Sequence, residues 1–597
     1  MWYSVHTTRR SHMFIFVDKN NCVFERTSYR VPGEKHPRAR KVCIGKKNPD
    51  GSFTGNSYYI ERCAKEKAEK KISELEEKVK AFEGIVASEE KKDKAETKLA
   101  VEAVSTRKKS GLTYAIESIM DKLSIFATLE EVLGKEKAEF ITSLIQYMIV
   151  TKSGAMDDFS FFDADHTHCC EHDISSPTIS RLFSSISETL ITDFFKKLHK
   201  NAPKDMTRGA HYASFDSTAF SSYSEDIDIV APSKGKQDPN LEHFCLSALY
   251  DTRTNMCGYY RLYRGNIPDV KTVSDLVDVT KTLNLSFNNR LIFDRGYTSW
   301  ENIYLVHKKL KSNVMMMLKS NLSIYSKAIE KAGTGFKNDS SLFIPQQGVF
   351  GTTVTEKLTL KVDKEEEEIH AFLHVYYSPE RYSSECSELE DTIDFEIERV
   401  NKLISEQQVT ATDLSNKTCI NQNLRKYIKV IKTSNTEAML EKDCDAVAKR
   451  LANAGYFVIL TTEHLSAKET LLIYRGRDNV ERLFNVVKNN LGFTRADVKN
   501  DETLQGKMFI VMLSAMVITY IKNSIREHRQ ELTRKMTYNK ACLELESIYS
   551  HKLKGKTAYC EISDRQKLLL SSLGIDLPEA QISVKLKRSY TKKKPKE

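Results

Sequence analysis

The sequence predicts an α/β protein in which helical regions flank a central sheet and a small β unit comes first. Between residues 205 and 319, short runs of β-branched and aromatic residues alternate with amphipathic helical patterns. Residues 112–200 and the region after Ala467 carry apolar residues at the period of an α-helix. A chain of 597 residues is too long for one hydrophobic core, so about three to five domains are expected.

Composition narrows the class of protein. A hydrophobic content of 40% with 29% charged residues indicates an ordinary globular chain and excludes the disordered and membrane classes. The longest apolar run, Met508 to Ile521, is shorter than the roughly 20 residues that cross a bilayer, so we expect a buried core helix. No secretory leader is expected after Arg9 and Arg10, because the following apolar run is too brief. Twelve scattered cysteines favour reduced thiols in a cytosol-like compartment.

Positive charge gathers at the two ends of the chain. Residues 1–60 hold eleven Lys or Arg against four Asp or Glu, and residues 585–597 hold seven against one. The two excesses together exceed the net charge of +10 for the whole chain, so the part between them is slightly acidic. Basic ends indicate a polyanionic partner such as DNA, because each neutralised phosphate releases counterions. A solubilising tail and a charged hairpin remain an equally good explanation from charge alone.

The regions before residue 200 give three local predictions. Met13 to Val17, Cys22 to Phe24 and Lys41 to Ile44 are expected to be strands, separated by polar and Pro/Gly-containing stretches. The Glu/Lys-rich stretch 60–109 is predicted to be an exposed helical hairpin, since its a/d spacing (Ile72, Leu75, Val79, Phe82, Val86) lasts only about two heptads. Apolar residues after Ser176-Pro177 keep helical spacing (Ile179, Leu182, Phe183, Ile186, Leu190, Phe194) and predict a core helix, with a helix-turn-helix as the alternative.

The central region predicts a specific order of elements. Strands are expected at His211 to Asp216, Phe244 to Tyr250, Met256 to Tyr263, Leu291 to Phe293 and Asn313 to Leu318. One helix carries Val273, Leu276, Val277 and Leu283, and a second begins with a capping box formed by Thr298 and Glu301. The resulting order, β-β-β-α-β-α-β, is that of an RNase H-like fold.

Three carboxylates stand out against this order. Asp216 and Asp294 each follow a predicted strand, where an Asp is more often a turn or a helix cap. The segment Tyr474 to Lys488 places Tyr474, Arg477, Glu481 and Lys488 within an arc of about 60° on an ideal helix. Such a stripe is most often a solvated charged face. Together with two strand-end carboxylates, however, Glu481 completes the oxygen donor set that two Mg²⁺ ions need for an in-line displacement.

These motifs resemble those of bacterial insertion-sequence transposases of the Asp-Asp-Glu class. The Tyr-x2-Arg-x3-Glu-x6-Lys spacing is similar to the signature of one subgroup, and Asp294-Arg295-Gly296-Tyr297 resembles its second-Asp motif. Gly265-Asn266 followed by Asp269 resembles the usual approach to that Asp, and residues 320–465 resemble the β-rich insertion of these proteins. The resemblance covers about 205–530, and the Glu/Lys-rich stretch 60–109 has no counterpart in the pattern.

The resemblance implies a function, a cofactor and partners. Asp216, Asp294 and Glu481 would bind two Mg²⁺ or Mn²⁺ ions, while Tyr474, Arg477, Lys488 and Arg295 would contact DNA. The implied reaction is cleavage of phosphodiester bonds at transposon ends and joining of the freed 3′-hydroxyls to target DNA. Double-stranded DNA is then the partner, in a paired-end complex of a homodimer associated with the nucleoid in the bacterial cytoplasm. The alternatives are a nuclease of the same fold without strand transfer and a transposase-derived DNA-binding protein.

The expected domains follow from these elements. They are a basic β unit (1–59), a Glu/Lys-rich helical segment (60–111), a helical domain that is a candidate for DNA binding (112–204), an RNase H-like core in two parts (205–319 and 466–530) with a β-rich insertion between them (320–465), a C-terminal helical region (531–584) and a basic disordered tail (585–597).

A second cluster of candidate ligands lies before the core. Asp163, Asp165, His166, His168, Cys169, Cys170 and His172 crowd into ten residues. Structural zinc sites draw two ligand pairs from separated places, and no second pair follows at the usual spacing. An ordinary polar linker is therefore expected, with a zinc site as the alternative.

Overall fold

The computed structural model describes residues 13–29, 35–74, 107–202, 212–224, 226–232, 241–283, 290–362, 365–406, 408–432, 438–533, 535–553 and 556–578, with a few single positions before residue 81. Two compact units make up the chain, Met1–Ser105 and Thr106–Glu597, and each is described by itself. The predicted basic tail and the positions Leu75, Val79, Phe82 and Val86 of the expected helical hairpin lie outside the described residues.

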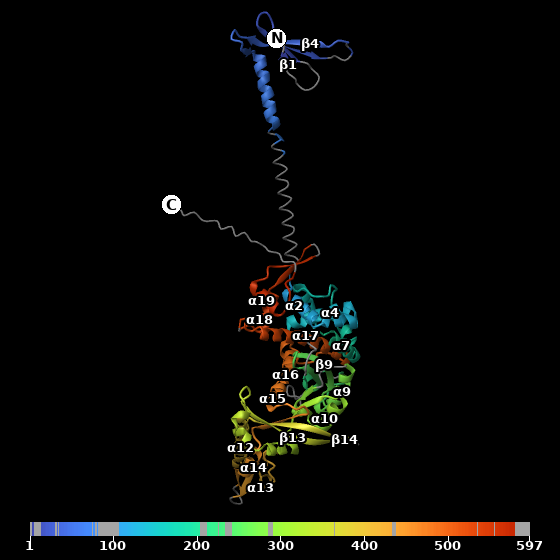
Figure 1. Ribbon diagram of the computed structural model, residues 1–597, viewed down its shortest axis with the longest axis vertical. Coiled ribbons are helices and arrows are strands. Elements are labelled where there is room, and N and C mark those ends of the chain that lie inside the picture. Colours follow the sequence, from blue (N-terminus) through green and yellow to red (C-terminus); the bar gives the residue numbers. More distant parts are fainter. Residues whose placement is uncertain are drawn as a thin grey trace, which may run out of the picture. The chain divides into compact units, whose positions relative to one another are not determined.

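The first unit is an antiparallel sheet followed by a helix (Figure 1). Its strands, in spatial order, are β1 (Tyr3–Ser4), β2 (Met13–Val17), β3 (Cys22–Tyr29), β4 (Arg38–Lys47) and β5 (Phe53–Gly55). The three predicted strands are confirmed, and β3 and β4 are longer than expected. Residues 57–74 are helical, and Ile72 on this helix is exposed.

After the short strand β6 (Lys108–Lys109), the second unit has six helices that share one hydrophobic core with a long later helix. They are α2 (Gly111–Lys122), α3 (Ile125–Leu133), α4 (Lys135–Thr151), α5 (Phe159–Asp165), α6 (Ser176–Ser184) and α7 (Glu188–Asn201). The long helix, α17 (Asp501–Glu527), is buried along Met508–Thr519, which confirms the predicted core helix. By length and composition α17 is apolar enough to span a membrane, yet 83% of its most apolar window is buried inside the fold.

The single helix expected after Ser176 is wrong. A turn at Ser185 and Ile186 separates α6 from α7, and the hydroxyl of Ser187 caps α7 by accepting a hydrogen bond from the Leu190 N–H. Helical spacing of apolar residues continues across the turn because both helices bury the same side against the core.

Nine strands of the described part form one mixed sheet in the order β12-β13-β14-β17-β11-β10-β7-β8-β9. Their bounds are β7 (Ala213–Ser222), β8 (Glu242–Asp251), β9 (Met256–Arg264), β10 (Arg290–Phe293), β11 (Asn313–Met317), β12 (Phe343–Ile344), β13 (Val349–Val362), β14 (Glu365–Tyr377) and β17 (Tyr456–Thr461). Strand β10 is parallel to both β7 and β11, and the other pairings are antiparallel. With α9 (Thr272–Leu283) and α10 (Trp300–Tyr304) between the strands, the chain follows the predicted order β-β-β-α-β-α-β.

The predicted capping box before α10 is wrong by one residue. Ser299 caps the helix by accepting a hydrogen bond from the Asn302 N–H at 3.0 Å. Thr298 instead donates to the carbonyl oxygens of Arg295 and Met317, both at 2.9 Å. Thr298 therefore ties the turn after Asp294 to strand β11.

The segment 320–465 is divided between the main sheet and a helical lobe. After α11 (Ser323–Ala332), strands β13, β14 and β17 extend the nine-stranded sheet. The lobe lies between β14 and β17 and has a small core of its own. It comprises α12 (Pro379–Ser405), α13 (Ala411–Ser415), β15 (Ile428–Lys432), β16 (Ala438–Lys442) and α14 (Cys444–Leu451). At its neck, the Ser378 N–H donates to the Gly455 carbonyl at 2.9 Å.

The C-terminal part is not purely helical as expected. Between α18 (Tyr538–Glu546) and α19 (Asp564–Ser572), the hairpin β18 (Tyr549–Leu553) and β19 (Lys556–Tyr559) pairs with β6 (Lys108–Lys109). The hairpin therefore depends on pairing with a segment more than 400 residues earlier in the chain. The local sequence pattern does not indicate this pairing.

A buried histidine connects the main sheet with the helix that follows it, α15 (Ala467–Arg475). His374 on β14 is fully buried, and its Nδ1 lies 2.9 Å from the Thr353 hydroxyl. Its Nε2 lies 3.0 Å from the hydroxyl of Thr461 and 3.2 Å from that of Thr470. Burial lowers the pKa of His374 from 6.5 to about 4, so the ring is neutral near neutral pH.

We expect His374 to make stability depend on pH. The folded pKa of about 4 lies below the ordinary value of 6.5, so stability is complete above pH 6.5 and falls as pH drops toward 4, by about 3 kcal/mol. The free energy of unfolding, measured by urea titration across this range, should lose part of its pH slope in His374→Gln. His370→Gln, an exposed position on the same strand, should keep the slope. Equal slopes in the two variants would contradict this role.

A close helix contact gives a second prediction. A Cβ on Gly506 of α17 would lie 2.2 Å from the carbonyl oxygen and 2.5 Å from the Cα of Phe183 on α6. Gly506→Ala should therefore lower the free energy of unfolding by about 1–3 kcal/mol, because backbone cannot yield as a side chain can. Gly335→Ala, where no atom lies within 4 Å of the new Cβ, should change it by less than about 0.5 kcal/mol. Equal stability of the two variants would mean that α6 shifts freely.

Candidate active site

The pairing of β7 with β10 brings two carboxylates together. These strands run parallel with Ala213, Ser214 and Phe215 opposite Leu291, Ile292 and Phe293. Asp216 and Asp294 are the next residues on each strand, so they lie side by side where the pairing ends. The expectation that Asp216 ends its strand is wrong, because β7 continues to Ser222 along β8. Asp294 directly follows β10 as predicted.

The segment Tyr474 to Lys488 is not one continuous helix, which corrects the prediction of a single narrow stripe. Helix α15 ends at Arg475, α16 (Asp478–Asn485) begins after Arg477, and residues Val486–Asn490 form a wider π-helical turn. At the break the N–H groups of Gly476 and Arg477 donate to the carbonyls of Ile473 and Tyr474, three residues back. Gly476 and Arg477 keep right-handed helical dihedral angles, so one tighter turn joins α15 to α16.

Arg477 joins the two strands to the helix. Its Nη1 lies 3.2 Å from Asp216 Oδ2, and its Nη2 lies 3.1 Å from Glu481 Oε1. Nη2 also lies 3.6 Å from Asp478 Oδ1. The guanidinium side chain is only 12% exposed, so these ion pairs are partly shielded from solvent. One planar cation thus holds a carboxylate of the sheet and a carboxylate of the helix with separate nitrogens.

Tyr474 holds the remaining carboxylate. Its hydroxyl donates to Asp294 Oδ1 at 3.3 Å, and the side chain is buried at the end of α15. Burial raises the pKa of Tyr474 well above its usual range, so the phenol remains a hydrogen-bond donor. All three predicted carboxylates therefore contact the Tyr474–Glu481 segment or belong to it.

Asp216 shows that the carboxylates affect one another. Its pKa is raised to about 6, mainly by burial and to a smaller extent by the charges of Asp294 and Glu481. The Ser217 N–H, which donates to Asp216 Oδ1 at 2.9 Å, and the Arg477 guanidinium oppose this effect. The site therefore disfavours the ionised form of Asp216 until enough positive charge is present.

Lys488 and Arg295 are the two other residues predicted to contact DNA. The Lys488 ammonium is half-buried, 5.0 Å from the centre of the Phe220 ring on β7, and burial lowers its pKa. Arg295 is exposed in the short 3₁₀ helix Arg295–Tyr297 that follows Asp294.

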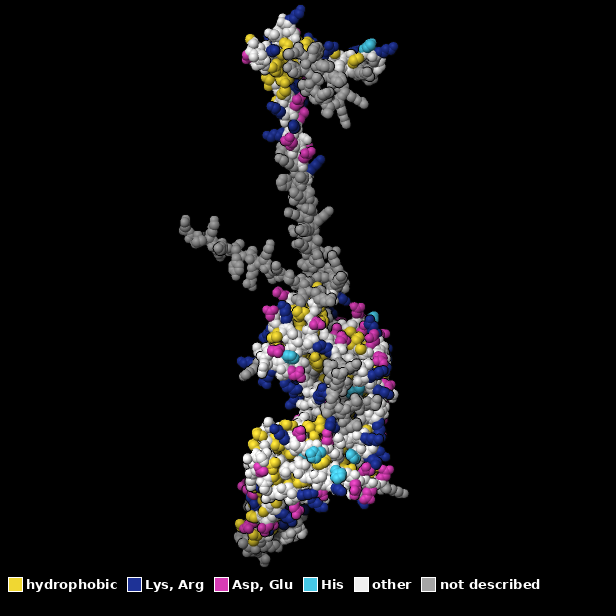
Figure 2. Space-filling model, viewed as in Figure 1, with side chains coloured by type: hydrophobic (Ala, Val, Ile, Leu, Met, Phe, Trp, Pro, Cys, Tyr) yellow, Lys and Arg dark blue, Asp and Glu magenta, His cyan; other side chains and the backbone are white. Residues whose placement is uncertain are grey.

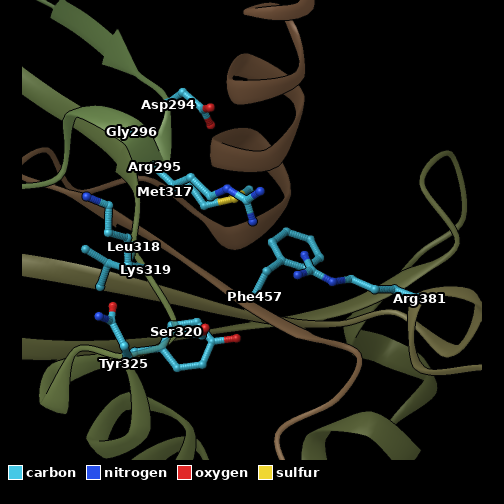
Figure 3. A pocket seen from close by; sticks show the side chains of 11 residues that line it. Asp294, Arg295, Gly296, Met317, Leu318, Lys319, Ser320, Tyr325, Arg381 and Phe457 are labelled. Carbon is cyan, nitrogen blue, oxygen red and sulfur yellow. The ribbon is translucent and has the colours of Figure 1, made fainter. Parts of the chain in front are cut away.

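A cleft of about 550 Å³ opens next to Asp294 on the side of Arg295. Arg381, near the start of α12, lies with its guanidinium carbon 5.8 Å from the Phe457 ring centre and is ion-paired with Glu385 at 2.7 Å. In Figure 3, Arg295 and Arg381 reach toward the same space from opposite sides. Lys319 and Arg475 also line this region. The sequence reasoning missed Arg381, Lys319 and Phe457, because nothing in their local pattern indicates a meeting place.

Asp269 is a further acidic neighbour of the site. It lies in the short 3₁₀ helix Asp269–Lys271, and its Oδ1 accepts a hydrogen bond from the Ser217 hydroxyl at 2.5 Å. Ser217 directly follows Asp216, and a Cβ on Gly296 would lie 3.9 Å from Asp269 Oδ2. The Gly265-Asn266-x2-Asp269 pattern was the signal for this residue in the sequence.

The carboxylates fit divalent metal ions in kind. Carboxylate oxygens are the ligands that Mg²⁺ prefers, and the raised pKa of Asp216 reflects its burial together with the nearby charges of Asp294 and Glu481. Within the described residues, no three His, Cys, Asp or Glu side chains stand close enough to share an ion in this arrangement. The guanidinium of Arg477 lies between Asp216 and Glu481. A metal ion that bound Asp216 Oδ2 or Glu481 Oε1 would compete with this guanidinium for the same oxygen.

The His/Cys cluster before the core consists of structural contacts in the part of the chain that the structure describes. His168 Nε2 lies 3.0 Å from Asp163 Oδ1, and its Nδ1 lies 3.2 Å from the Ser143 hydroxyl. The N–H of Cys169 donates to Gln146 Oε1 at 3.1 Å, and that of Cys170 to Ser143 at 2.8 Å. The polar groups of this cluster tie the segment after α5 to α4.

Comparisons with known proteins identify the family. Among curated proteins, none matches this sequence. Among solved structures, the chain is similar to a piggyBac transposase in a synaptic complex with hairpin DNA, at 12% identity and a TM-score of 0.29, over 76% of this chain and 70% of that one. The family described as "Transposase DDE domain" matches residues 213–517, which is more than half of the chain and includes Asp216, Asp294 and Glu481. This protein therefore belongs to the family of transposase DDE domain proteins.

Proposed function

We propose that the chain is a DNA transposase that cleaves phosphodiester bonds at transposon ends and joins the freed 3′-hydroxyls to target DNA. Asp216, Asp294 and Glu481 are the metal-binding carboxylates, on an RNase H-like core of the kind found in bacterial insertion sequences. The observation that carries the proposal is the meeting of Asp216 and Asp294 on paired strands, with Glu481 linked to Asp216 through Arg477. The substrate is double-stranded DNA, held by a homodimer that pairs two ends.

Two Mg²⁺ or Mn²⁺ ions would supply activation of the attacking oxygen and stabilisation of the leaving oxygen. The protein's own groups position these events. Tyr474 fixes the orientation of Asp294 by its hydrogen bond. The register of β7 and β10 fixes the separation of the two aspartates. Water or a 3′-hydroxyl is the nucleophile, so no covalent protein intermediate is needed.

Arg477 can bind either the carboxylates of the site or a DNA phosphate. In the structure it neutralises Asp216 and Glu481. A DNA phosphate matches the same planar guanidinium with a bidentate pair of hydrogen bonds. When substrate arrives, Arg477 turns from the carboxylates to the phosphate, and the carboxylate oxygens become free for metal ions. Substrate and metal binding would thereby favour each other.

The basic side chains in the neighbouring cleft extend this substrate surface. Arg295 lies beside Asp294, and Arg381 and Arg475 line the same cleft from α12 and α15. Phosphate contacts of this kind position a strand without reading its sequence. Lys488 lies near Phe220, further along β7 than Asp216, and would contact the DNA strand there.

Removing any one carboxylate should abolish cleavage while end binding persists. Asp216→Asn, Asp294→Asn and Glu481→Gln should each slow cleavage of linear DNA carrying the element's ends by roughly a thousandfold or more, since several kcal/mol of metal stabilisation are lost. Asp478→Asn is the matched control, because Asp478 also contacts Arg477 but lies outside the triad. Near-normal cleavage by a triad variant, with Mg²⁺ present, would remove that residue from the site. Cleavage without joining would indicate a nuclease.

Arg477 should compete with metal ions for the carboxylates. Without added metal, Arg477→Gln should lower the free energy of unfolding by about 1–3 kcal/mol, mainly because the largely buried Asp216 loses its cation while the exposed Glu481 loses little. Mg²⁺ should then stabilise this variant more than it stabilises the native protein, as measured by the shift in the thermal unfolding midpoint.

The control for this competition is Arg475→Gln, which removes an exposed guanidinium that lines the same cleft. Its response to Mg²⁺ should equal that of the native protein. If Mg²⁺ stabilised Arg477→Gln no more than this control, Arg477 would not occupy the ion-binding space.

A further inference from the structure

The sheet of the first unit has two chemically different faces. Alternate residues of a strand point to opposite faces, and paired residues of neighbouring strands share a face. The register places Ile15, Glu25 and Val42 on one face, and Phe16, Phe24 and Cys43 on the other. Arg26 lies opposite Lys41 and shares the face of Phe24.

The helix of residues 57–74 packs on the first face. Arg62 of the helix donates to Glu25 at 2.7 Å, and Glu25 is only 5% exposed. Just before the helix, the Asn56 side chain donates to the Cys43 carbonyl at 2.8 Å. Since Glu25 points toward the helix, the face of Phe16, Phe24, Arg26, Lys41 and Cys43 points away from it. We name this second face the Lys41 face.

The Lys41 face combines aromatic rings with positive charge. The rings of Phe16 and Phe24 stack with centroids 5.7 Å apart, and the Lys41 ammonium lies 3.9 Å from the Phe24 centroid and 4.7 Å from that of Phe16. Arg26 and Lys41 are exposed, and no ion pair joins either of them to a described carboxylate. Arg26 and Lys41 face each other across the two strands, and like charges in this position are destabilising, so a bound anionic ligand would relieve their repulsion.

Strand β4 adds further positive charge next to the Lys41 face. Strand β4 reads Arg-Ala-Arg-Lys over Arg38–Lys41, and all four residues are exposed. Figure 2 shows dark blue Lys and Arg side chains along the arm that Figure 1 labels β4. The buried half of the β3–β4 pair, around Val23 and Ile44, anchors this exposed half. A stiff, basic, protruding sheet surface is thus held by the small core of the unit.

We propose that the Lys41 face lies in the major groove of double-stranded DNA and reads base edges with Arg26 and Lys41. The inference rests on the proposed function only for the identity of the nucleic acid. The major groove admits β-strands, and Arg or Lys there binds the O6 and N7 acceptors of guanine. Arg38 and Arg40 on the same strand supply contacts to the flanking phosphates.

Duplex rather than single-stranded DNA fits this surface. Single-strand binding relies on aromatic rings on which bases stack. Phe16 and Phe24 are half-buried, and the Lys41 ammonium lies over both rings. The ammonium and guanidinium donors are therefore the groups offered to a ligand, and these match the acceptors in the groove of a duplex.

The test is selection of sequence from a random duplex pool by the full chain, without divalent metal so that cleavage is absent. Native protein should enrich a guanine-containing motif. Arg26→Ala/Lys41→Ala should lose this enrichment and bind the selected duplex about tenfold or more weakly, because two base contacts are gone. Its salt dependence should stay close to that of the native protein, because Arg26 and Lys41 contact base edges while Arg38 and Arg40 still neutralise phosphates.

The control variant is Lys67→Ala/Lys70→Ala, which removes two exposed charges from the helix of the same unit. It should enrich the same motif as the native protein. A charge-preserving variant, Arg26→Lys/Lys41→Arg, should keep most of the salt dependence but change the motif. The proposal falls if native protein enriches no motif, if the helix variant loses as much, or if single-stranded DNA competes equally.

Failure of this proposal is distinguishable from failure of the proposed catalytic function. Asp294→Asn should enrich the native motif, since Asp294 belongs to the second unit. A native protein that enriches the motif but never cleaves would overturn the catalytic proposal alone. A protein that cleaves element ends while Arg26→Ala/Lys41→Ala retains full enrichment would overturn the groove-reading proposal alone.

Discussion

The ion pairs of Arg477 with Asp216 and Glu481 are the constraint on which the site depends. Carboxylates brought together in a partly buried place repel one another, and each loses solvation. A fold can keep them ionised only by supplying positive charge at short range. Arg477 lies in the tight turn between α15 and α16, four residues before Glu481, and contacts both carboxylates. The apolar side of α16 packs against the sheet and so fixes the position of this turn.

The element order of the central region could be predicted because strands and amphipathic helices leave periodic patterns in the sequence. The three carboxylates could be singled out for the same reason, since two follow such strands and one lies in a helical motif. Their surroundings were less predictable. The continuation of β7 beyond Asp216 follows from pairing with β8, and the local sequence pattern carries no signal of that pairing.

Contacts between distant segments account for the rest of what the sequence could not predict. Arg381 and Phe457 meet beside Asp294 although Asp294 lies more than 80 residues before either. The pairing of β18 with β6 joins the ends of the second unit. In the first unit, strand positions could be predicted, but the assignment of Arg26 and Lys41 to the same face depends on a register that a bulge between Val23 and Phe24 shifts.

The neck of the helical lobe has a consequence for how this chain can be shortened. Strands β14 and β17 are antiparallel neighbours, with Tyr377 opposite Tyr456 at their ends. Residues 378–455 are thus, in topological terms, an enlarged hairpin loop, and a tight turn of a few residues closes the same two strands. Such a deletion would keep the sheet but change the cleft, because it removes Arg381 and retains Phe457. A compact version of the protein would keep its framework and lose one wall of its cleft.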